Sequence, residues 1–527
     1  MASSTRNRSF ISTLGRIIFS RVFLVSLLLL IQVIIFWLLL SSVFDHSLTF
    51  YTLGIVFSLL TVVALVSNRD NPAYKLSWTM LILTLSPMGA IIYWIFGWQK
   101  IPTKKSRRLE QIVHQADQFI SENKQAKVKL EAMSSSAAQE SLYLQNYAHA
   151  PLYQKTNSKY FPLGENYFCE LKRQLKSAQK FIFLEYFIIN YSSKMWNDIL
   201  NILCERAEQG VEIRVMYDDF GSLLTVPGNF AKKMNQLGIK TVAFNRFRPF
   251  LEVRMNNRDH RKIAVIDGKV GFTGGINFAD EYINKIEIHG HWKDTGVMLE
   301  GEGVWSLTLM FLKMWRFATG ESSGTWEKYR YQTSPQLAPL AQREDLGFVQ
   351  PFGDSPHDDE TAGRNAYLNL INKAKQEVII TTPYLIIDNE INTALCQAAR
   401  NGVTVKIIVP GIADKWYSKF TSQAFYAQLI EAGVEIWEYV PGFIHSKTIL
   451  VDNKLGIVGT INLDYRSLYL NFEDGVWMYQ TPALDELRLD LKQTLKVCRQ
   501  IYLSQVRDAH LITHLLRGIL RVFATAM

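Results

Sequence analysis

Cysteine is scarce in this chain: four residues in 527, scattered without pairing motifs. Such spacing excludes a disulfide framework and predicts four buried free thiols. They are Cys169, Cys204, Cys396 and Cys498. Cysteine pairs and carboxylate runs at metal-ligand spacing are also missing, so we predict no metal and no cofactor.

Charge of one sign is only mildly in excess, with 57 basic and 48 acidic residues giving a net charge of +9. This excess suits either nucleic acid or anionic lipid as a partner. Three apolar runs near the N-terminus favour lipid: residues 22–44, which carry no charge, residues 50–66, and residues 76–98. The first and third are long enough to cross a bilayer, and the second is marginal.

We therefore predict an integral membrane anchor over residues 1–99, with two or three apolar segments. A cleaved signal peptide does not fit, because the first run is too long and no small-residue cleavage pattern follows it. Pro87 and Gly89 interrupt the third run and favour a kink or a partial insertion. Residues 100–150 are predicted to form a basic juxtamembrane helix, followed by a linker at SSSAAQES, residues 134–141.

Basic residues flank the anchor on both sides. Arg6, Arg8, Arg16 and Arg21 precede the first run, and Lys100, Lys104, Lys105, Arg107 and Arg108 follow the third. The positive-inside rule places both flanks in the cytoplasm, which requires an even number of crossings. We expect a multi-pass cell-membrane protein with a cytoplasmic catalytic domain; three complete crossings would put that domain outside.

The rest of the chain alternates strand and helix patterns in two similar halves, residues 151–345 and 346–527. AEQGVEIRVMYDD in the first half and AARNGVTVKIIVP in the second align without gaps. This internal duplication predicts an α/β fold of two pseudo-symmetric halves. The tail, residues 483–527, reads as helical, and its end, HLLRGILRVFATAM, is amphipathic and basic; a membrane-surface helix and a packing helix both fit.

Each half carries the same short motif. His260, Lys262 and Asp267 stand as HRKIAVID, with GGIN following at Gly274–Asn277. His445, Lys447 and Asp452 stand as HSKTILVD, with GTIN following at Gly459–Asn462. Each motif reads as strand, turn, strand, and the two-residue spacing puts His and Lys on one face.

Two imidazoles and two ammonium groups brought together suit a phosphate ester. One imidazole can attack phosphorus while the other protonates the departing oxygen. The two lysines, with the amides of Asn277 and Asn462, can hold the phosphoryl oxygens as charge develops. Asp267 and Asp452 each begin a turn, and we interpret them as structural supports.

The paired motifs resemble the phospholipase D superfamily, and the wider chain resembles its bacterial cardiolipin synthases. LEYFII, ITTPYLI, PGFIHSKTILVD and NLDYRSLYLNFE are similar to catalytic blocks of that family. The resemblance implies transfer of a phosphatidyl group between two phosphatidylglycerol molecules, with His260 as nucleophile and His445 as acid and base. It also implies that Asp294 and Glu473 hold the second nitrogen of an imidazole.

Three other functions compete with this prediction. A membrane-bound phospholipase D that transfers to water would use the same residues. A membrane-anchored nuclease is supported only by the net charge, and a non-catalytic scaffold conflicts with two complete motifs. The sequence leaves open the donor and acceptor lipids, the order of the two histidines and the oligomeric state.

Overall fold

The computed structural model describes most of the chain, namely residues 48–97, 103–246, 257–321, 326–331, 343, 345–357 and 360–526. The chain divides into two compact units. The first comprises residues 1–99 with the short segments 226–230 and 246–255, and the second holds the remainder.

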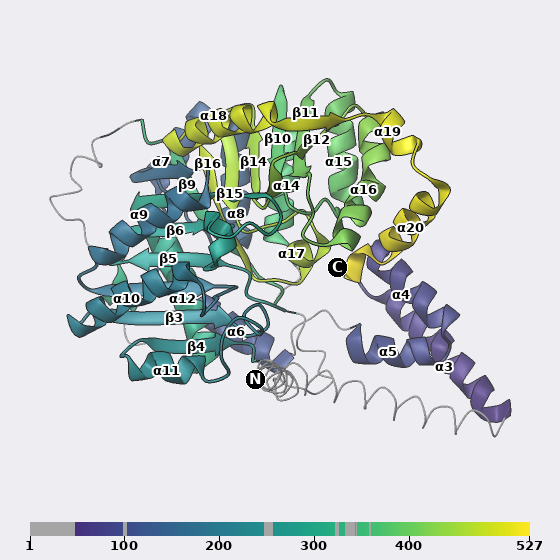
Figure 1. The fold of residues 1–527 in the computed structure, drawn as a ribbon, viewed down its shortest axis with the longest axis horizontal. Coiled ribbons are helices and arrows are strands. Elements are labelled where there is room, and N and C mark those ends of the chain that lie inside the picture. The colour runs from purple at the N-terminus through teal and green to yellow at the C-terminus, as the bar shows by residue number, and fades with distance from the viewer. Residues whose placement is uncertain are drawn as a thin grey trace, which may run out of the picture. The chain divides into compact units, whose positions relative to one another are not determined.

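The first unit contains three described helices, α3 (Leu48–Ser67), α4 (Pro72–Thr84) and α5 (Met88–Phe96) (Figure 1). The expected apolar run 50–66 lies in α3, whereas run 76–98 is broken between α4 and α5 at Pro87, which lacks a backbone N–H. None of the helices in the described ranges has the length and apolar character needed to cross a membrane. The run at 22–44 lies outside the described residues.

The second unit begins with three helices, α6 (Thr103–Asp117), α7 (Lys124–Met133) and α8 (Ser135–Tyr147). The predicted linker at 134–141 is therefore wrong, because these residues open α8. The Ser134 side chain caps the helix by accepting a hydrogen bond from the Ala137 amide at 3.2 Å, and Leu144 is fully buried. A serine-rich stretch that reads as flexible is thus also a good helix start.

The first half of the second unit is a seven-stranded sheet in the order β1-β8-β6-β5-β2-β3-β4. Its strands are β1 (Thr156–Phe161), β2 (Phe181–Tyr186), β3 (Glu212–Asp218), β4 (Lys240–Phe244), β5 (Lys262–Ile266), β6 (Val270–Gly274) and β8 (Gly296–Gly301). Strands β2 and β3 pair in parallel.

The second half repeats this order in an eight-stranded sheet, β9-β16-β15-β14-β10-β11-β12, with β17 added at the edge. Its strands are β9 (Phe348–Asp354), β10 (Glu377–Thr381), β11 (Thr404–Pro410), β12 (Glu435–Tyr439), β14 (Thr448–Val451), β15 (Leu455–Gly459), β16 (Glu473–Tyr479) and β17 (Cys498–Ile501). The same strand order in both sheets confirms the predicted duplication and the α/β fold.

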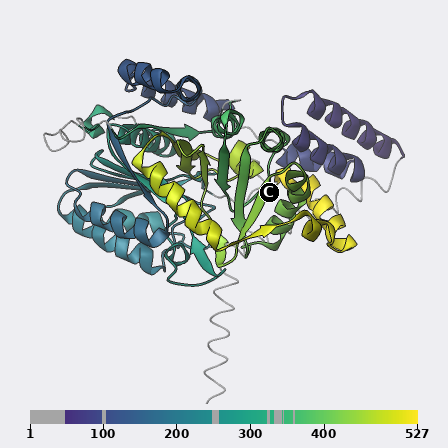
Figure 2. The same ribbon diagram turned by 90° about the horizontal axis from the view of Figure 1, so that it is seen from above.

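Helices cover the sheets in both halves (Figures 1 and 2). The helices of the first half are α9 (Gly164–Lys176), α10 (Lys194–Glu208), α11 (Phe230–Gln236) and α12 (Val304–Thr319). Those of the second half are α14 (Ala362–Lys373), α15 (Asn389–Arg400), α16 (Trp416–Glu431), α17 (Tyr465–Tyr469), α18 (Pro482–Lys496), α19 (Leu503–Arg507) and α20 (Leu511–Val522), of which α19 and α20 pack against α16. The tail was predicted to be helical throughout, but it also contains strand β17, which pairs antiparallel with β12.

The two halves share one apolar core, which fixes their relative position. One buried cluster combines Phe183 and Phe311 of the first half with Ile444 and Phe472 of the second. The Phe183 and Phe311 rings stack with centroids 4.6 Å apart. A small parallel sheet of β7 (His291–Lys293) and β13 (Gly442–Ile444) also joins one strand from each half.

The four cysteines are free, as predicted, but they are not all buried. Cys396 is buried, whereas Cys169 is exposed on α9.

Candidate active site

The two motif histidines are both held by backbone of the opposite half. His260 precedes β5, and its amide donates to the Phe472 carbonyl at 2.9 Å. His445 precedes β14, and its amide donates to the Lys293 carbonyl at 2.7 Å. Each histidine therefore sits where the halves meet, and neither position is complete without both halves.

The side chains of the two histidines also bind residues of the opposite half. His260 Nδ1 lies 2.9 Å from Glu473 Oε2 of the second half, and His445 Nδ1 lies 2.6 Å from Asp294 Oδ2 of the first half. Glu473 and Asp294 are fully buried. Each acid of the resemblance thus contacts an imidazole, but it is the imidazole of the other half.

The GGIN and GTIN turns differ at their second residue, and the acid beside each turn, Asp294 or Glu473, explains the difference. Thr460 of GTIN donates its hydroxyl hydrogen to Glu473 Oε2 at 2.5 Å and so orients the carboxylate. The equivalent residue of GGIN is Gly275, where an added Cβ would lie 2.1 Å from Asp294 Oδ1. The shorter acid occupies the space that a threonine side chain would need.

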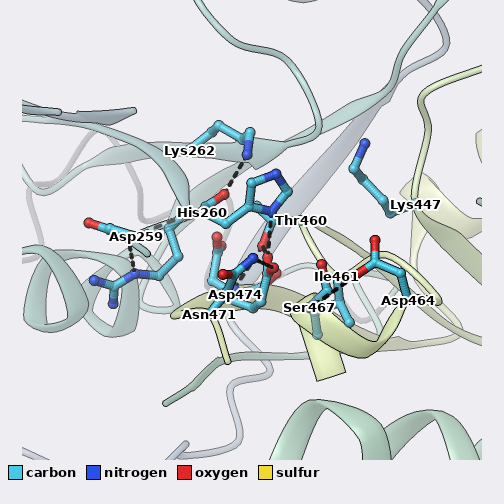
Figure 3. Close-up of polar contacts among 12 residues, drawn as sticks. Asp259, His260, Lys262, Lys447, Thr460, Ile461, Asp464, Ser467, Asn471 and Asp474 are labelled. Carbon is cyan, nitrogen blue, oxygen red and sulfur yellow. Dashed lines mark hydrogen bonds and ion pairs between the residues drawn. The ribbon is translucent and has the colours of Figure 1, made fainter. Parts of the chain in front are cut away.

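The two lysines bring positive charge to the same place. Lys262 and Lys447 are fully buried, and each Nζ donates to the carbonyl of the histidine two residues earlier. Burial lowers the pKa of Lys262 to about 7 and that of Lys447 to about 8. Figure 3 shows both lysines in one close-up with His260. The charge of Lys447 also acts on His260, so the two motifs form one site.

Both imidazoles are neutral in this environment. Burial, reinforced by the positive lysines, lowers the pKa of His445 to about 4 and that of His260 well below its ordinary value. A neutral imidazole that donates Nδ1–H to a carboxylate carries its lone pair on Nε2. Each histidine is therefore set up to attack, or to accept a proton, through Nε2.

The side chains of the motif aspartates bind backbone amides at the start of a neighbouring strand, β2 for Asp267 and β10 for Asp452. Asp267 accepts three backbone hydrogen bonds of 2.7–2.9 Å, from the amides of Gln179, Lys180 and Phe181. Asp452 accepts three of 2.7–3.0 Å, from Lys375, Gln376 and Glu377. These contacts support the interpretation of both residues as structural supports.

We expect Asp267→Ala to destabilise the catalytic unit by about 1–3 kcal/mol, because three backbone amides, one of them part-buried, lose their acceptor. The backbone adds strain, since residue 267 has a φ of 53°. Asp267→Asn should cost less, because Asn keeps an acceptor oxygen and tolerates this conformation. Denaturant unfolding measures the difference; equal stability of Asp267→Ala and the parent would contradict a supporting role.

The two asparagines of the turns are buried near the motifs. Asn277 Nδ2 donates to the Tyr282 hydroxyl at 2.7 Å, and its Oδ1 accepts from the Ile188 amide at 3.0 Å. In the described part of the chain, Oδ1 of Asn462 has no hydrogen-bond partner. Phosphate binding by these amides stays a prediction, and for Asn277 it would require exchange of the Tyr282 contact.

A buried ionic cluster beside the first motif was not predicted. Arg261 contacts Asp259 at 3.0 Å and Glu185 at 2.5 Å, and Asp474 accepts a hydrogen bond from Thr273 at 2.6 Å. Charged residues next to the motif histidine and next to Glu473 are visible in the sequence, but their partners come from other strands. The cluster places buried charges beside the first motif.

The histidines at 510 and 514 stand at a spacing that some metal sites use. His514 Nε2 instead lies 3.1 Å from the Arg507 carbonyl, and His510 Nδ1 accepts from the Ile512 amide. No group of three His, Cys, Asp or Glu side chains gathers as a metal site among the residues that the structure describes.

Comparison with known proteins matches both halves to one family. A family profile described as "Cardiolipin synthase, PLD-like domain" matches residues 171–297 and 367–495, and one described as "Phospholipase_D-nuclease N-terminal" matches residues 55–98. A cardiolipin synthase of Halalkalibacterium halodurans is 34% identical over 461 residues, covering 87% of this chain and 89% of its own. One from Geobacillus kaustophilus is 32% identical, covering 87% and 91%.

Among solved structures, the phosphatidylserine synthase of Haemophilus influenzae superposes with a TM-score of 0.55 at 14% identity, covering 73% of this chain and 97% of its own. This likeness concerns the fold. The two matched domains, the near full-length relatives and the paired-motif site agree with one another, and the chain belongs to the cardiolipin synthase family with phospholipase D-like domains.

Proposed function

We propose that the chain is a phosphatidyltransferase that joins two phosphatidylglycerol molecules into cardiolipin and releases glycerol. The observation that carries this proposal is the crossed pairing of His260 with Glu473 and of His445 with Asp294, beside two buried lysines. It supplies two Nε2 nitrogens and two positive charges for one phosphodiester, as a two-step transfer needs.

In the first step, His260 Nε2 attacks the phosphorus of one phosphatidylglycerol. A P–N bond forms, the bond between phosphorus and the headgroup glycerol oxygen breaks, and His445 donates a proton to that oxygen. His445 must be protonated for this step. The negative phosphodiester offsets Lys262 and Lys447 when it binds, which raises the pKa of His445 from its low value in the empty site.

In the second step, His445 accepts the proton from a glycerol hydroxyl of the second phosphatidylglycerol. That oxygen attacks phosphorus, the P–N bond breaks, and His260 regains its lone pair. Proton and electron counts return to their starting values. Lys262 and Lys447 stabilise the oxygens of both transition states electrostatically, because they are held in place before the reaction begins.

Product analysis tests the proposed transfer. The full chain reconstituted with phosphatidylglycerol should give cardiolipin and glycerol in equal amounts, measured by mass spectrometry. Phosphatidic acid as the main product would instead identify water as the acceptor and favour a hydrolytic phospholipase D. A lipid mixture with phosphatidylethanolamine added would identify the preferred donor.

The covalent intermediate gives a separate prediction. Rapid acid-free quenching with phosphatidylglycerol labelled at phosphorus should leave label on His260, found by peptide mapping, because a P–N bond survives mild alkaline conditions better than acid. Added glycerol should convert cardiolipin back to phosphatidylglycerol. Label on His445 would reverse the two roles, and absence of label with full turnover would contradict a two-step mechanism.

Membrane association is part of the proposal, since the substrates are membrane lipids, and we propose that residues 1–99 anchor a cytoplasmic catalytic domain. In intact cells, an external protease should leave the region after residue 110 uncut, whereas it should cut after the membrane is opened. Reporter fusions after residue 110 and at the C-terminus provide the control. Cleavage in unbroken cells would contradict this orientation and leave the chemistry unaffected.

A further inference from the structure

Helix α20 exposes its apolar side. Leu511, Leu515, Ile519 and Phe523 recur every four residues, which places them in one row. Leu511 is 80% exposed and Leu515 64%, and no residue of the helix is buried. A helix on the surface of a globular domain normally turns such a row toward the core. In α20 the opposite side makes the contacts.

The side of α20 opposite the apolar row holds it to the domain, and Leu516, Arg517 and Leu520 on that side are half-buried. Arg517 donates to Gln423 of α16 at 2.8 Å, and Arg521 donates to Gln428 of α16 at 3.2 Å. The Arg521 guanidinium also lies over the Phe425 ring, 4.7 Å from its centroid. These contacts set the rotation of the helix about its axis, so the apolar row faces away from α16.

Helix α16 adds aromatic residues to the same region. Residues 416, 420, 424 and 428 form one row on α16. The C-terminal part of this row contacts α20 through Ala424 and Gln428. The N-terminal part carries Trp416, which is 63% exposed, with Phe420 in ring contact. Tryptophan at the edge of an apolar surface is typical of a membrane–water interface.

The charge of residues 509–526 bears on which partner fits the apolar row of α20. Residues 509–526 contain two arginines and two histidines but no aspartate or glutamate. Because these residues place no carboxylate beside the apolar row, anionic headgroups would meet no repulsion from them, and the two arginines on the side toward α16 keep the charge of the helix positive. A protein partner would need acidic groups beside an apolar groove, whereas a bilayer of anionic phospholipid supplies both features.

The helix is also tied to the active site. Ala524, just after α20, is buried in the core of the second half. The short η5 (Ala524–Ala526) packs against α17, which begins three residues after Asn462 of the GTIN turn. Helix α20 is therefore connected to the second motif through two short elements, η5 and α17.

We propose that α20 is an interfacial lipid-binding helix. Its apolar row (Leu511, Leu515, Ile519 and Phe523), together with the exposed Trp416 of α16, enters the surface of a bilayer rich in anionic phospholipid and keeps the catalytic unit at its lipid substrate. This inference rests on the proposed function, and it assigns to the C-terminal helix a role separate from the N-terminal anchor.

Fluorescence quenching by lipid tests the proposal without requiring activity. In a Cys169→Ser background of the full chain, an environment-sensitive label is placed at Leu515→Cys, and a control label at Val128→Cys, which is 72% exposed on α7. In vesicles of phosphatidylglycerol and phosphatidylcholine, the label at 515 should shift to the blue and be quenched by brominated acyl chains. The label at 128 should do neither.

A blue shift at 515 without quenching by lipid would overturn the proposal, because another copy or another segment would then cover the helix. Equal behaviour of the two labels would also overturn it. Both results are independent of whether cardiolipin is formed, which is measured separately on the parent protein.

Kinetics provide the second measurement. Leu515→Ser with Ile519→Ser should raise the apparent KM for phosphatidylglycerol in vesicles by roughly tenfold with kcat unchanged, because each change removes apolar area from the interface. With short-chain phosphatidylglycerol below its micelle concentration, kcat/KM should stay at the parent value. An unchanged vesicle KM, or an equal loss on the soluble substrate, would contradict interfacial binding.

Discussion

His260→Ala and His445→Ala should each lower the rate of phosphatidyl transfer by roughly 10³-fold or more, because residues that act as a unit lose most of their effect together. The structure gives the reason. Each imidazole presents Nε2 to the same site, one to form the P–N bond and one to move the proton. The double variant should be little slower than either single variant.

The measurement is cardiolipin formation by the reconstituted full chain, normalised to folded protein. His114→Ala serves as the matched control, since the His114 side chain is 90% exposed on α6 and should leave the rate unchanged. Activity of either single variant within tenfold of the parent would exclude a shared two-histidine site. Additive losses in the double variant would indicate two independent sites.

Glu473→Gln should lower kcat by roughly 10²–10⁴-fold with little change in KM, by analogy with the loss of an orienting carboxylate in other imidazole-based sites. Glutamine preserves the size of the side chain but removes the negative charge that stabilises the imidazolium and selects the Nδ1–H tautomer. Asp294→Asn should have the same kind of effect through His445. Asp485→Asn, at an exposed position on α18, is the control.

The pH profile separates this positioning role from a merely structural one. Removing the carboxylate beside an imidazole lowers the pKa of that imidazole. His445 must be protonated to donate its proton in the first step, so the alkaline limb of the rate profile of Asp294→Asn should move to lower pH, whereas a packing defect would lower the rate at every pH alike. An unchanged profile together with a large loss of thermal stability would show that the acid only holds the fold.

The strands and motifs of the catalytic unit were predictable because they depend on local patterns. The apolar run Ile263–Ile266 and the turn at Asp267 predict β5 and its hairpin to β6, and the second motif repeats both. Composition predicted less well where one residue type serves two purposes. Ser134 fits a linker by composition but caps α8. Cys498 stands in a tail that reads as helical but lies in β17, and the pairing of β17 with β12 depends on the tertiary structure.

The sequence by itself determined the two motifs, the duplicated α/β halves and the class of chemistry, because spacing along a strand decides which side chains share a face. Only the tertiary structure decided which acid serves which histidine. Glu473 lies 213 residues from His260, and Asp294 lies 151 residues from His445. Contacts at such separations follow from how the two sheets pack on a common core, and no local pattern encodes that packing.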